Sequence, residues 1–470
     1  MEHQQIITYQ RDMFIEHKLD VIGQSAVRED VNGAKTSLAG QLDKASTQGR
    51  VFTEELIGMV CSATNISRAY KQVKKNKGVA GIDNIPIGSF ADWYAREGNE
   101  LVDQILRGEY LPSAVKTVEI PKPNGGTRQL GIPTVKDRIV QQAISQVLTP
   151  IYEQVFSNHS YGFRPKRSAQ QAIRQASAYV ADGHNIVVDL DMKSFFDEVN
   201  HDKLMYRLSE RIKDKGLLKL IRQYLQSGVM VGGLAHQRLK GTPQGSPLSP
   251  LLSNIVLDEL DKELEKRGHY FVRYADDVSI LVRSQKAGER VLLSVCSYLT
   301  TKLKLKVNEE KSKVCKSSAT KFLGYTILAN GIITIAKQSI ERLKQKVRKL
   351  IKRNKGVKFE SLILDLSPIL RGWLNYFRIA SCKKLLHNLD AWIRRKLRCY
   401  RLKQCKRVIT VKRFLKSLGI TSRQSWILAL SGKGWWRKSG CPQAHQAMNL
   451  KWFDYLGLYN MSRNYVLLQN

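Results

Sequence analysis

Apolar residues recur with two different spacings along this chain, and each spacing predicts a different kind of element. Short runs rich in β-branched and aromatic residues, typical of strands, cover residues 115–120, 127–132, 186–191, 271–282, 322–327 and 332–335. Apolar residues three and four positions apart, typical of helices, recur within residues 65–79, 137–155, 249–267, 290–303 and 340–351. The predicted fold class is therefore α+β.

The run Phe271–Val282 predicts a strand, a tight turn and a second strand. Two adjacent acids, Asp276 and Asp277, fall at the turn. Neighbouring carboxylates repel each other unless a cation lies between them, and Mg²⁺ binds one or two carboxylates together with substrate phosphates. A solvated Asp-Asp turn is the alternative when the pair is considered alone.

A second apolar run, residues 186–191, also ends in acids. Asp189 and Asp191 face the same way because strand side chains alternate, and Asp191 stands at the end where a ligand can approach. Asp189 is expected to satisfy buried backbone groups or to balance a base. If the sheet brings Asp191 beside Asp276 and Asp277, the three carboxylates can hold two metal ions roughly 3.5–4 Å apart.

Two further segments are candidates for nucleotide contacts. Lys122 and Arg128 flank the turn between strands 115–120 and 127–132, where two cations suit a triphosphate, although surface cations on a hairpin are common. In the loop 240–247, Gln244 is followed by a glycine that permits close approach of a flat partner. Ser249 is the expected N-cap of the next helix, with a proline at its first position.

Charge narrows the class of partner. The 470 residues include 77 Lys and Arg against 41 Asp and Glu, which favours a polyanion, although charge alone also fits a ribosome-like or membrane-surface protein. Residues 337–423 hold 26 basic and 4 acidic residues. Cations alternate there with aromatic residues that either stack on bases or form the core of a helical bundle; they are Trp373, Tyr376, Trp392 and Tyr400.

The location is expected to be cytoplasmic, with no membrane partner. No run of 18 apolar residues is present, and the N-terminus lacks the pattern of a signal peptide. The seven cysteines form no Cys-x-x-Cys pair, so neither a zinc site nor a disulfide framework is indicated.

These segments resemble the motifs of reverse transcriptases, and in particular of bacterial group II intron-encoded proteins that lack the C-terminal endonuclease domain. The resemblance covers roughly residues 61–460, with the motifs in the family's order. Its segments are Ile120–Arg128 and Ser160–Pro165 of the fingers, Asp191–Asp197, Gly241–Asn254, the active-site box Tyr274–Asp277, Phe322–Tyr325 of the primer grip, and Arg371–Phe377 and Gly432–Arg437 of the thumb and maturase region.

The resemblance implies a right-hand polymerase: fingers, a palm with an antiparallel sheet, a helical thumb and a basic helical maturase region. The expected divisions are an N-terminal extension over 1–60, fingers over 61–180, palm over 181–335, thumb over 336–410 and a DNA-binding-like tail over 411–470. Asp191, Asp276 and Asp277 would bind Mg²⁺. Lys122 and Arg128 would contact the incoming triphosphate. Phe196 would be the steric gate against a 2′-hydroxyl, Gln244 would lie near template and nucleotide, and Lys311 is a weaker candidate for protonating pyrophosphate.

The implied function is RNA-directed DNA synthesis on a group II intron RNA template, from a DNA or RNA primer and dNTPs, together with splicing assistance. Without the paired cysteines and histidines of an endonuclease domain, mobility would need a primer made elsewhere. Three alternatives stay open: a splicing factor with a vestigial polymerase site, a domesticated reverse transcriptase for repair or defence, and an RNA-dependent RNA polymerase, against which Phe196 argues. The oligomeric state is not predicted.

Overall fold

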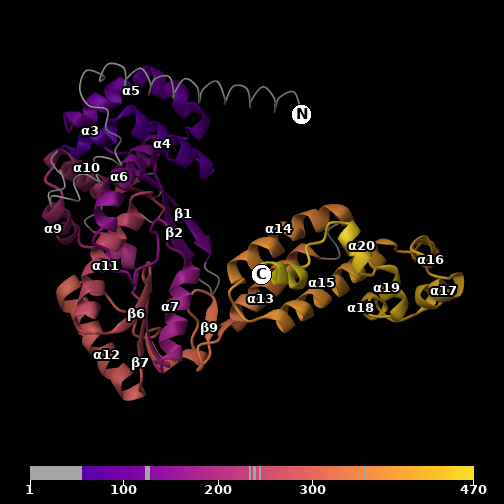
Figure 1. The fold of residues 1–470 in the computed structure, drawn as a ribbon. Coiled ribbons are helices and arrows are strands. Elements are labelled where there is room, and N and C mark those ends of the chain that lie inside the picture. The colour runs from indigo at the N-terminus through magenta and orange to yellow at the C-terminus, as the bar shows by residue number, and fades with distance from the viewer. Residues whose placement is uncertain are drawn as a thin grey trace. The chain divides into compact units, whose positions relative to one another are not determined.

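The described part of the chain forms two compact units. A computed structural model describes residues 55–121, 127–231, 234–236, 240–242, 245–352 and 356–469. Of these, the first unit contains the residues up to Ser168, Val188–Ile280 and Lys286–Val314, and the second contains Ala169–Val187, Leu281–Gln285 and the residues from Cys315 onward. Figure 1 shows the elements of each unit.

Helices open the first unit. They are α3 (Leu56–Cys61), α4 (Ala63–Lys75), the short 3₁₀ helix η1 (Ile87–Ser89), α5 (Phe90–Leu106) and α6 (Val135–Glu153). The predicted helices near 65–79 and 137–155 are confirmed, each with slightly earlier bounds. The α4 stripe of Ile66, Ala69, Tyr70 and Val73 is buried, and the Asn65 side chain donates to the Ala143 carbonyl at 3.1 Å. Helices α4 and α6 therefore share one core.

A four-stranded sheet follows in the order β2-β1-β4-β5. Strands β1 (Val115–Pro121) and β2 (Thr127–Ile132) form the predicted hairpin, with Ile120 opposite Arg128. Strands β4 (Val229–Val231) and β5 (Leu234–His236) are antiparallel to each other, and β4 runs parallel to β1. The sequence did not predict β4 or β5, because three residues are too few to show an alternating pattern.

The acidic strands belong to a second four-stranded sheet, ordered β6-β7-β3-β8. Its strands are β6 (Tyr270–Tyr274), β7 (Asp277–Val282), β3 (Ile186–Leu190) and β8 (Lys313–Lys316). The helices of this part of the chain are α8 (Phe195–Glu198), α9 (His201–Arg211), α10 (Lys215–Gln226), α11 (Ser249–Lys266) and α12 (Gln285–Tyr298), the last followed by a π-helical turn over Leu299–Leu303. Helix α11 packs against β6 (Figure 1).

The predicted N-cap of α11 is wrong by one residue. Ser249 is the first helical residue, and Leu248 occupies the cap position without a side-chain cap bond. The Ser249 backbone N–H instead donates to the Ser246 hydroxyl at 3.3 Å. A serine three residues upstream thus accepts from the first N–H group of the helix, and Pro250 occupies the second helical position instead of the predicted first.

The second unit starts with α7 (Ala169–Ala181) and a short hairpin, β9 (Tyr325–Ile327) and β10 (Ile333–Ile335). The hairpin confirms strands within the predicted ranges 322–327 and 332–335, and its turn contains Asn330 and Gly331. Gly331 has φ +79°, and its carbonyl accepts a hydrogen bond from the Ser177 hydroxyl at 2.6 Å. A Cβ at this glycine would lie 2.9 Å from the Ser177 carbonyl oxygen, so the turn requires glycine.

The remainder of the second unit is helical. Its helices are α13 (Lys337–Leu350), α14 (Phe359–Phe377), α15 (Lys383–Gln404), α16 (Val408–Ser417), α17 (Ser422–Leu430), α18 (Trp435–Lys438), α19 (Pro442–Ala447), α20 (Leu450–Tyr455) and α21 (Met461–Leu467). Leu366, Leu370 and Leu374 of α14 are fully buried. In the residues that could be described, no helix has the length and apolar character needed to cross a membrane.

Candidate active site

The Asp-Asp segment adopts the predicted strand–turn–strand arrangement. Strand β6 ends at Tyr274, Ala275 occupies the left-handed region with φ +59°, and β7 begins at Asp277. Asp276 is half-buried and Asp277 is exposed, whereas Val278 directly after them is fully buried. The apolar flanks therefore anchor the hairpin and leave both carboxylates at its tip.

The first acidic strand brings Asp191 to the same end of the sheet. Strands β3 and β7 are neighbours. Arg283, the residue after β7, reaches His184 and Asp182, which precede β3, with nitrogen–nitrogen and nitrogen–oxygen distances of 3.3 and 3.4 Å. The end of β7 thus lies beside the start of β3, and the strands are antiparallel. Asp191 follows the last residue of β3, so it lies at the sheet end where Asp277 opens β7.

A short loop fixes the backbone of Asp191. Its N–H donates to the Ser312 hydroxyl at 3.1 Å, and its carbonyl accepts from the Asn308 N–H at 2.8 Å. The Lys311 ammonium lies 3.9 Å from the Asp191 carboxylate, whose side chain is 42% exposed. The structure therefore brings Lys311, the weaker of the predicted candidates, next to an acid that remains accessible from solution.

The oxygen donors at this sheet end suit a hard cation in an open site. Across the described ranges, no group of three or more His, Cys, Asp or Glu side chains is arranged to hold a metal ion unaided. Mg²⁺ retains waters and is commonly held by one or two carboxylates plus substrate phosphates, so it does not need such a closed group. Asp191, Asp276 and Asp277 supply the required ligand type, with the nucleotide expected to complete the coordination.

Phe196 is held in place from both sides. It lies in α8, which begins after Ser194 in a left-handed conformation with φ +50°. Its ring is 9% exposed and packs edge-on against Phe195, with centroids 5.4 Å apart. Its carbonyl accepts from the Thr242 N–H at 2.6 Å. A Cβ at Gly241 would lie 2.9 Å from that same carbonyl oxygen, so the loop needs glycine to pack there.

Glu198 connects α8 to two other segments. Its carboxylate accepts hydrogen bonds from Lys240 at 2.9 Å and from Lys306 at 3.3 Å. These hydrogen bonds, the Lys240 bond foremost, lower the pKa of Glu198. Glu198 is half-buried, but both lysines are exposed to solvent screening, so its role is to connect segments rather than to stabilise the fold strongly.

Three predicted nucleotide contacts fall outside the described atoms. Lys122 and Gln244 are not among the described residues, and of Arg128 only the backbone, paired within the β1–β2 hairpin, is described. Their predicted roles remain predictions.

One buried cluster beside the Asp-Asp turn was missed by the sequence analysis. The Arg273 side chain is fully buried in β6 and forms a two-point contact with Asp261 of α11, at 2.7 and 2.5 Å. It also donates to the Asn254 side chain at 2.9 Å and to the Ala275 carbonyl at 3.0 Å. A charged residue inside an otherwise apolar strand, and an acid on the buried side of α11, were the available signals.

In the second unit, the primer-grip-like segment packs on the thumb-like helix. The Tyr376 hydroxyl donates to the Leu323 carbonyl at 2.9 Å, and the Tyr325 and Tyr376 rings lie 5.7 Å apart. Gly324 has φ +86°, and a Cβ there would lie 3.2 Å from the Phe377 ring. The two motifs that sequence analysis noted separately therefore form one contact.

The aromatic residues of the basic region divide between core and surface. Tyr400 is 2% exposed and donates to the Val357 carbonyl, so for this residue the core interpretation is confirmed. Tyr376 is 37% exposed. Trp392 is half-buried beneath Arg348 and Lys396, whose charged groups lie 5.7 and 5.5 Å from its ring centroid.

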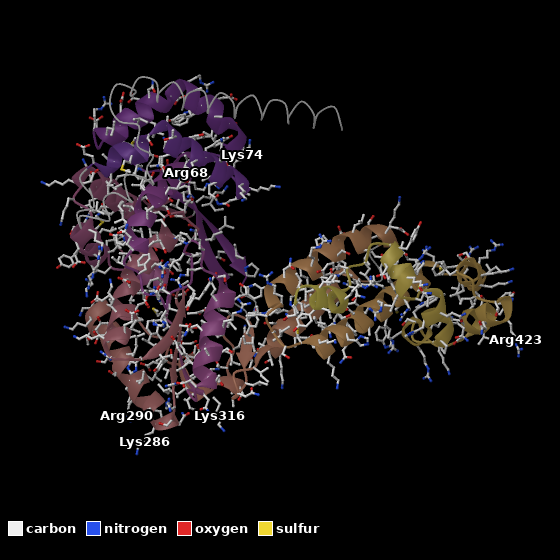
Figure 2. All side chains as sticks on the ribbon, in the orientation of Figure 1. Arg68, Lys74, Lys286, Arg290, Lys316 and Arg423 are labelled. Atoms are coloured by element: carbon white, nitrogen blue, oxygen red, sulfur yellow. The ribbon has the colours of Figure 1, made fainter. Side chains whose placement is uncertain are left out.

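A cation–aromatic surface, defined here as Arg395, Lys396, Trp392 and Trp436, runs along α15 and α18. The Arg395 guanidinium lies 4.2 Å from the Trp436 ring centroid, and the Lys396 ammonium lies 5.5 Å from it. Trp436 is 40% exposed. Basic side chains also line the adjacent helices, including Arg423 on α17 (Figure 2). Partly exposed cations beside an accessible ring suit phosphate contacts and base stacking.

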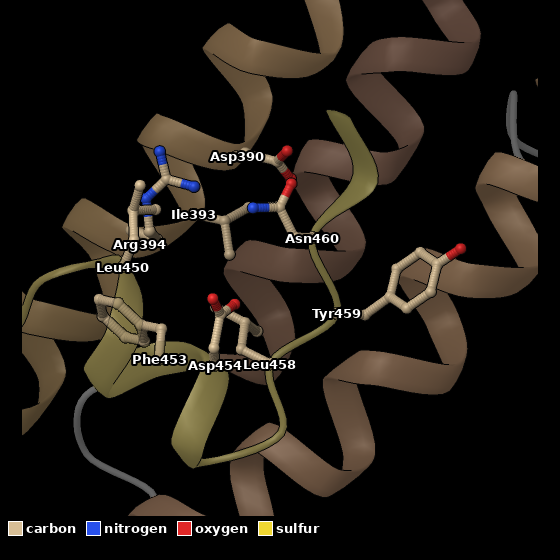
Figure 3. A pocket seen from close by; sticks show the side chains of 9 residues that line it. All are labelled: Asp390, Ile393, Arg394, Leu450, Phe453, Asp454, Leu458, Tyr459 and Asn460. Atoms are coloured by element: carbon tan, nitrogen blue, oxygen red, sulfur yellow. The ribbon is translucent and has the colours of Figure 1, made fainter. Parts of the chain in front are cut away.

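A small pocket near α21 has a structural explanation. It lies between α15, α20 and the segment preceding α21, and Asp390 lines it (Figure 3). The Asp390 carboxylate accepts from the backbone N–H groups of Met461 and Ser462 at 3.2 and 2.8 Å. Burial nevertheless raises the pKa of Asp390. The acid thus serves the start of α21, and its polar atoms need no ligand.

Comparison with known proteins identifies the family. Residues 120–327 match the family "Reverse transcriptase (RNA-dependent DNA polymerase)", and residues 340–418 match the "Group II intron, maturase-specific domain". Protein YkfC of Escherichia coli strain K12 is 31% identical over 310 residues, which span 57% of this chain and 81% of YkfC. The chain belongs to the reverse transcriptase family. The predicted family, polymerase fold with a helical maturase region, and enzyme class are confirmed.

Two further relatives of this reverse transcriptase carry informative names. The group II intron-encoded protein LtrA of Lactococcus lactis subsp. cremoris is 30% identical over 328 residues, which cover 55% of this chain and 54% of LtrA. The retron Ec73 reverse transcriptase of Escherichia coli is 25% identical over 309 residues, covering 59% of this chain and 92% of that protein. The match thus spans about half of the length of LtrA and most of the shorter relatives.

Proposed function

We propose that this reverse transcriptase copies a group II intron RNA into DNA and assists the folding of that RNA during splicing. The observation that carries the proposal is the antiparallel pairing of β3 and β7, which puts Asp191 at the sheet end occupied by Asp276 and Asp277. Carboxylates gathered at one sheet end, in a chain with a surplus of basic residues, suit phosphoryl transfer along a polyanionic template.

The family uses divalent metal ions, and the finer proposal is that Mg²⁺ is the ion. Asp191, Asp276 and Asp277 would hold it, and bound Mg²⁺ would supply charge neutralisation and a lowered pKa for the attacking primer hydroxyl. The chain's own residues would align the reactants: the three carboxylates would hold the cation that neutralises the phosphates, and Lys122 and Arg128 would clamp the triphosphate. Lys311, 3.9 Å from Asp191, is positioned to give a proton to the departing pyrophosphate.

Phe196 is proposed to select deoxyribose. Its ring is buried against Phe195 and its backbone is bonded to Thr242, so the ring cannot easily move away from a larger sugar. A rigid side chain excludes a 2′-hydroxyl better than a mobile one, since exclusion depends on the cost of displacing it.

The intron-RNA role rests on the maturase-specific match and the cation–aromatic surface. LtrA is named as a group II intron-encoded protein, and the same class of partner is proposed for this chain. DNA or RNA primers and dNTPs complete the proposed partners. A cytoplasmic location remains a prediction from cysteine use; the seven cysteines, all within the described residues, form no disulfide.

Primer extension on an RNA template tests the proposal. Purified protein, an annealed primer, dNTPs and Mg²⁺ should yield full-length cDNA, and the RNA that co-purifies should contain a group II intron sequence. Intron splicing that depends on the protein, with no cDNA under any divalent ion, would overturn the polymerase part and leave a splicing factor.

A further inference from the structure

The Asp-Asp turn carries a backbone conformation that its own sequence does not favour. Ala275 is in the left-handed region with φ +59°, where a Cβ is disfavoured. Such a residue persists only when the surrounding structure holds it there. Since Asp276 and Asp277 follow directly, the direction of both carboxylates depends on what holds Ala275.

A buried guanidinium supplies that support. Arg273 Nη1 donates to the Ala275 carbonyl at 3.0 Å and to the Asn254 side chain at 2.9 Å, while Nε and Nη2 contact the two Asp261 oxygens. Both side chains of the Arg273–Asp261 pair are completely buried. One planar group therefore fixes the turn and two positions on α11 at once, a geometry that a lysine ammonium cannot reproduce.

The start of the fingers-like motif Ser160–Pro165, with His159 before it, closes the turn from another side. The Arg273 N–H donates to the His159 carbonyl at 2.9 Å, and the Tyr161 N–H donates to the Arg273 carbonyl at 2.8 Å. Asn254 donates to the Gly162 carbonyl at 2.9 Å. A Cβ at Gly162 would lie 2.3 Å from the Ala275 backbone nitrogen, so these two backbones touch.

We propose that Arg273, with Asp261 and Asn254, is a positioning group that sets the direction of the Asp276 and Asp277 carboxylates and couples them to helix α11. The inference rests on the proposed polymerase function and deepens it. Arg273 is buried and does not touch substrate; it acts through the Ala275 carbonyl. The Gly241–Asn254 motif includes the start of helix α11, so the segment expected beneath the template and the proposed metal-binding turn share one buried contact.

The charges of the buried pair balance each other. Burial by itself raises the pKa of Asp261, and the Arg273 charge and hydrogen bonds counteract that rise. The positive charge of Arg273 is thereby matched within the core, so the pair adds little net field at the turn. Its contribution to Asp276 and Asp277 is one of geometry.

Arg273→Lys is the direct test, because it keeps the positive charge and removes the planar guanidinium that makes these contacts at once. Asn254→Ala is the second variant, because it removes the links to Arg273 and Gly162 without leaving a buried charge. Asp214→Asn is the matched control: Asp214 is a buried carboxylate that caps α10 and accepts from the Ile57 N–H, and it contacts none of the residues around the turn.

Two readouts separate positioning from a general loss of stability. The first is the rate of primer extension as a function of Mg²⁺ concentration. The second is Mn²⁺ binding, followed by electron paramagnetic resonance, to the protein with a dideoxy-terminated template–primer and the next dNTP. Arg273→Lys and Asn254→Ala should lower the rate and the Mn²⁺ affinity by roughly 10- to 100-fold, as changes to outer-shell groups typically do. Template–primer affinity should stay within about twofold. Asp214→Asn should change neither readout while lowering the melting temperature, because an amide nitrogen cannot accept the hydrogen bond from the Ile57 N–H.

Each outcome decides the inference. A soluble Arg273→Lys protein with wild-type Mn²⁺ affinity and Mg²⁺ dependence would overturn it. If Arg273→Lys does not fold, Asn254→Ala decides in the same way. If the wild-type protein extends no primer, the proposed function fails, and the Mn²⁺ affinities still show whether the turn depends on these residues.

Discussion

The Asp-Asp turn of the first unit and the basic helices of the second unit use charge in opposite ways. At the turn, a few acids stand on buried strands and a fully buried ion pair supports them. In the basic helices, 26 basic residues within 337–423 face only 4 acids, and rings rather than carboxylates stand beside several of the cations. The first region depends on the geometry of single residues, whereas the second depends on summed charge and contact area.

This difference predicts how each region responds to mutation. A site that orients ligands loses its function when one group moves, since phosphoryl transfer needs aligned charges. A surface that neutralises many phosphates loses affinity in small steps, because each contact contributes its own share of counterion release.

The largest expected effect is that of Asp276→Ala. Removing one of the proposed metal-binding carboxylates should reduce cDNA synthesis by roughly 10³-fold, since metal ions supply several kcal/mol of charge stabilisation in the transition state. RNA binding, measured by filter retention, should stay unchanged. Asp202→Ala is the control, because Asp202 is an exposed acid paired with Arg222 on the surface. If Asp276→Ala and wild type synthesised cDNA equally well, the turn would not depend on single residues, and the comparison between the two regions would fail.

Phe196→Ala should have the next largest effect, on sugar selection. Removing the phenyl ring should raise the ratio of ribonucleotide to deoxyribonucleotide incorporation by roughly 10- to 100-fold, which is the range of discrimination that steric contacts of this size provide. Single-nucleotide extension with ATP and dATP measures the ratio. Phe195→Leu is the companion variant: because Phe195 packs edge-on against Phe196, a smaller rise is expected. An unchanged ratio in Phe196→Ala would contradict the gate.

Changes on the cation–aromatic surface should be smaller and dependent on salt. Arg395→Ala should lower the slope of log affinity against log salt by roughly 0.7 for single-stranded RNA. Trp436→Ala should weaken binding by roughly 5-fold or more at every salt concentration, because loss of stacking costs about 1–3 kcal/mol per base. Fluorescence anisotropy at several salt concentrations gives both values. If the affinity of the wild type for RNA did not change with salt concentration, the proposal that this surface binds RNA phosphates would be contradicted.

The smallest effect is expected from His445. Burial and the neighbouring arginines lower its pKa, and Arg398 lies 3.2 Å from its Nε2. In the folded state it therefore binds fewer protons than in the unfolded state, so stability is gained as pH rises toward 6.5 and lost as pH falls below it. The melting temperature of His445→Gln should vary less between pH 5 and 7 than that of wild type. If the melting temperatures of His445→Gln and wild type changed with pH in parallel, His445 would not be the cause of the pH dependence.

The sequence predicted the hairpin and the sheet-end acids well, for a physical reason. Residues such as Phe271 and Val278 have a strong strand pattern, and acids directly after apolar strands have few structural explanations. Strand β5 was missed because it is too short to show a period. The N-cap at Ser249 was misplaced by one residue, because the Leu248 carbonyl already accepts from the Leu251 and Leu252 N–H groups and the helix therefore begins at Ser249.

The buried cluster was harder to predict than the acids it supports. Arg273 and Asp261 come into contact only because α11 packs on β6. Neither the spacing of residues nor the composition predicts such a tertiary contact. The domain boundaries and the roles of Lys122, Arg128 and Gln244 remain predictions from the resemblance.

The contact between Thr242 and the Phe196 carbonyl limits how this polymerase can be modified. The backbone of the proposed sugar filter is tied to the loop that precedes α11, and Gly241 leaves no space for a side chain there. Variants intended to accept modified sugars should therefore change only the ring at position 196. Substitutions at position 241 would shift both Phe196 and the start of α11. Sugar selection and template binding would therefore be lost together.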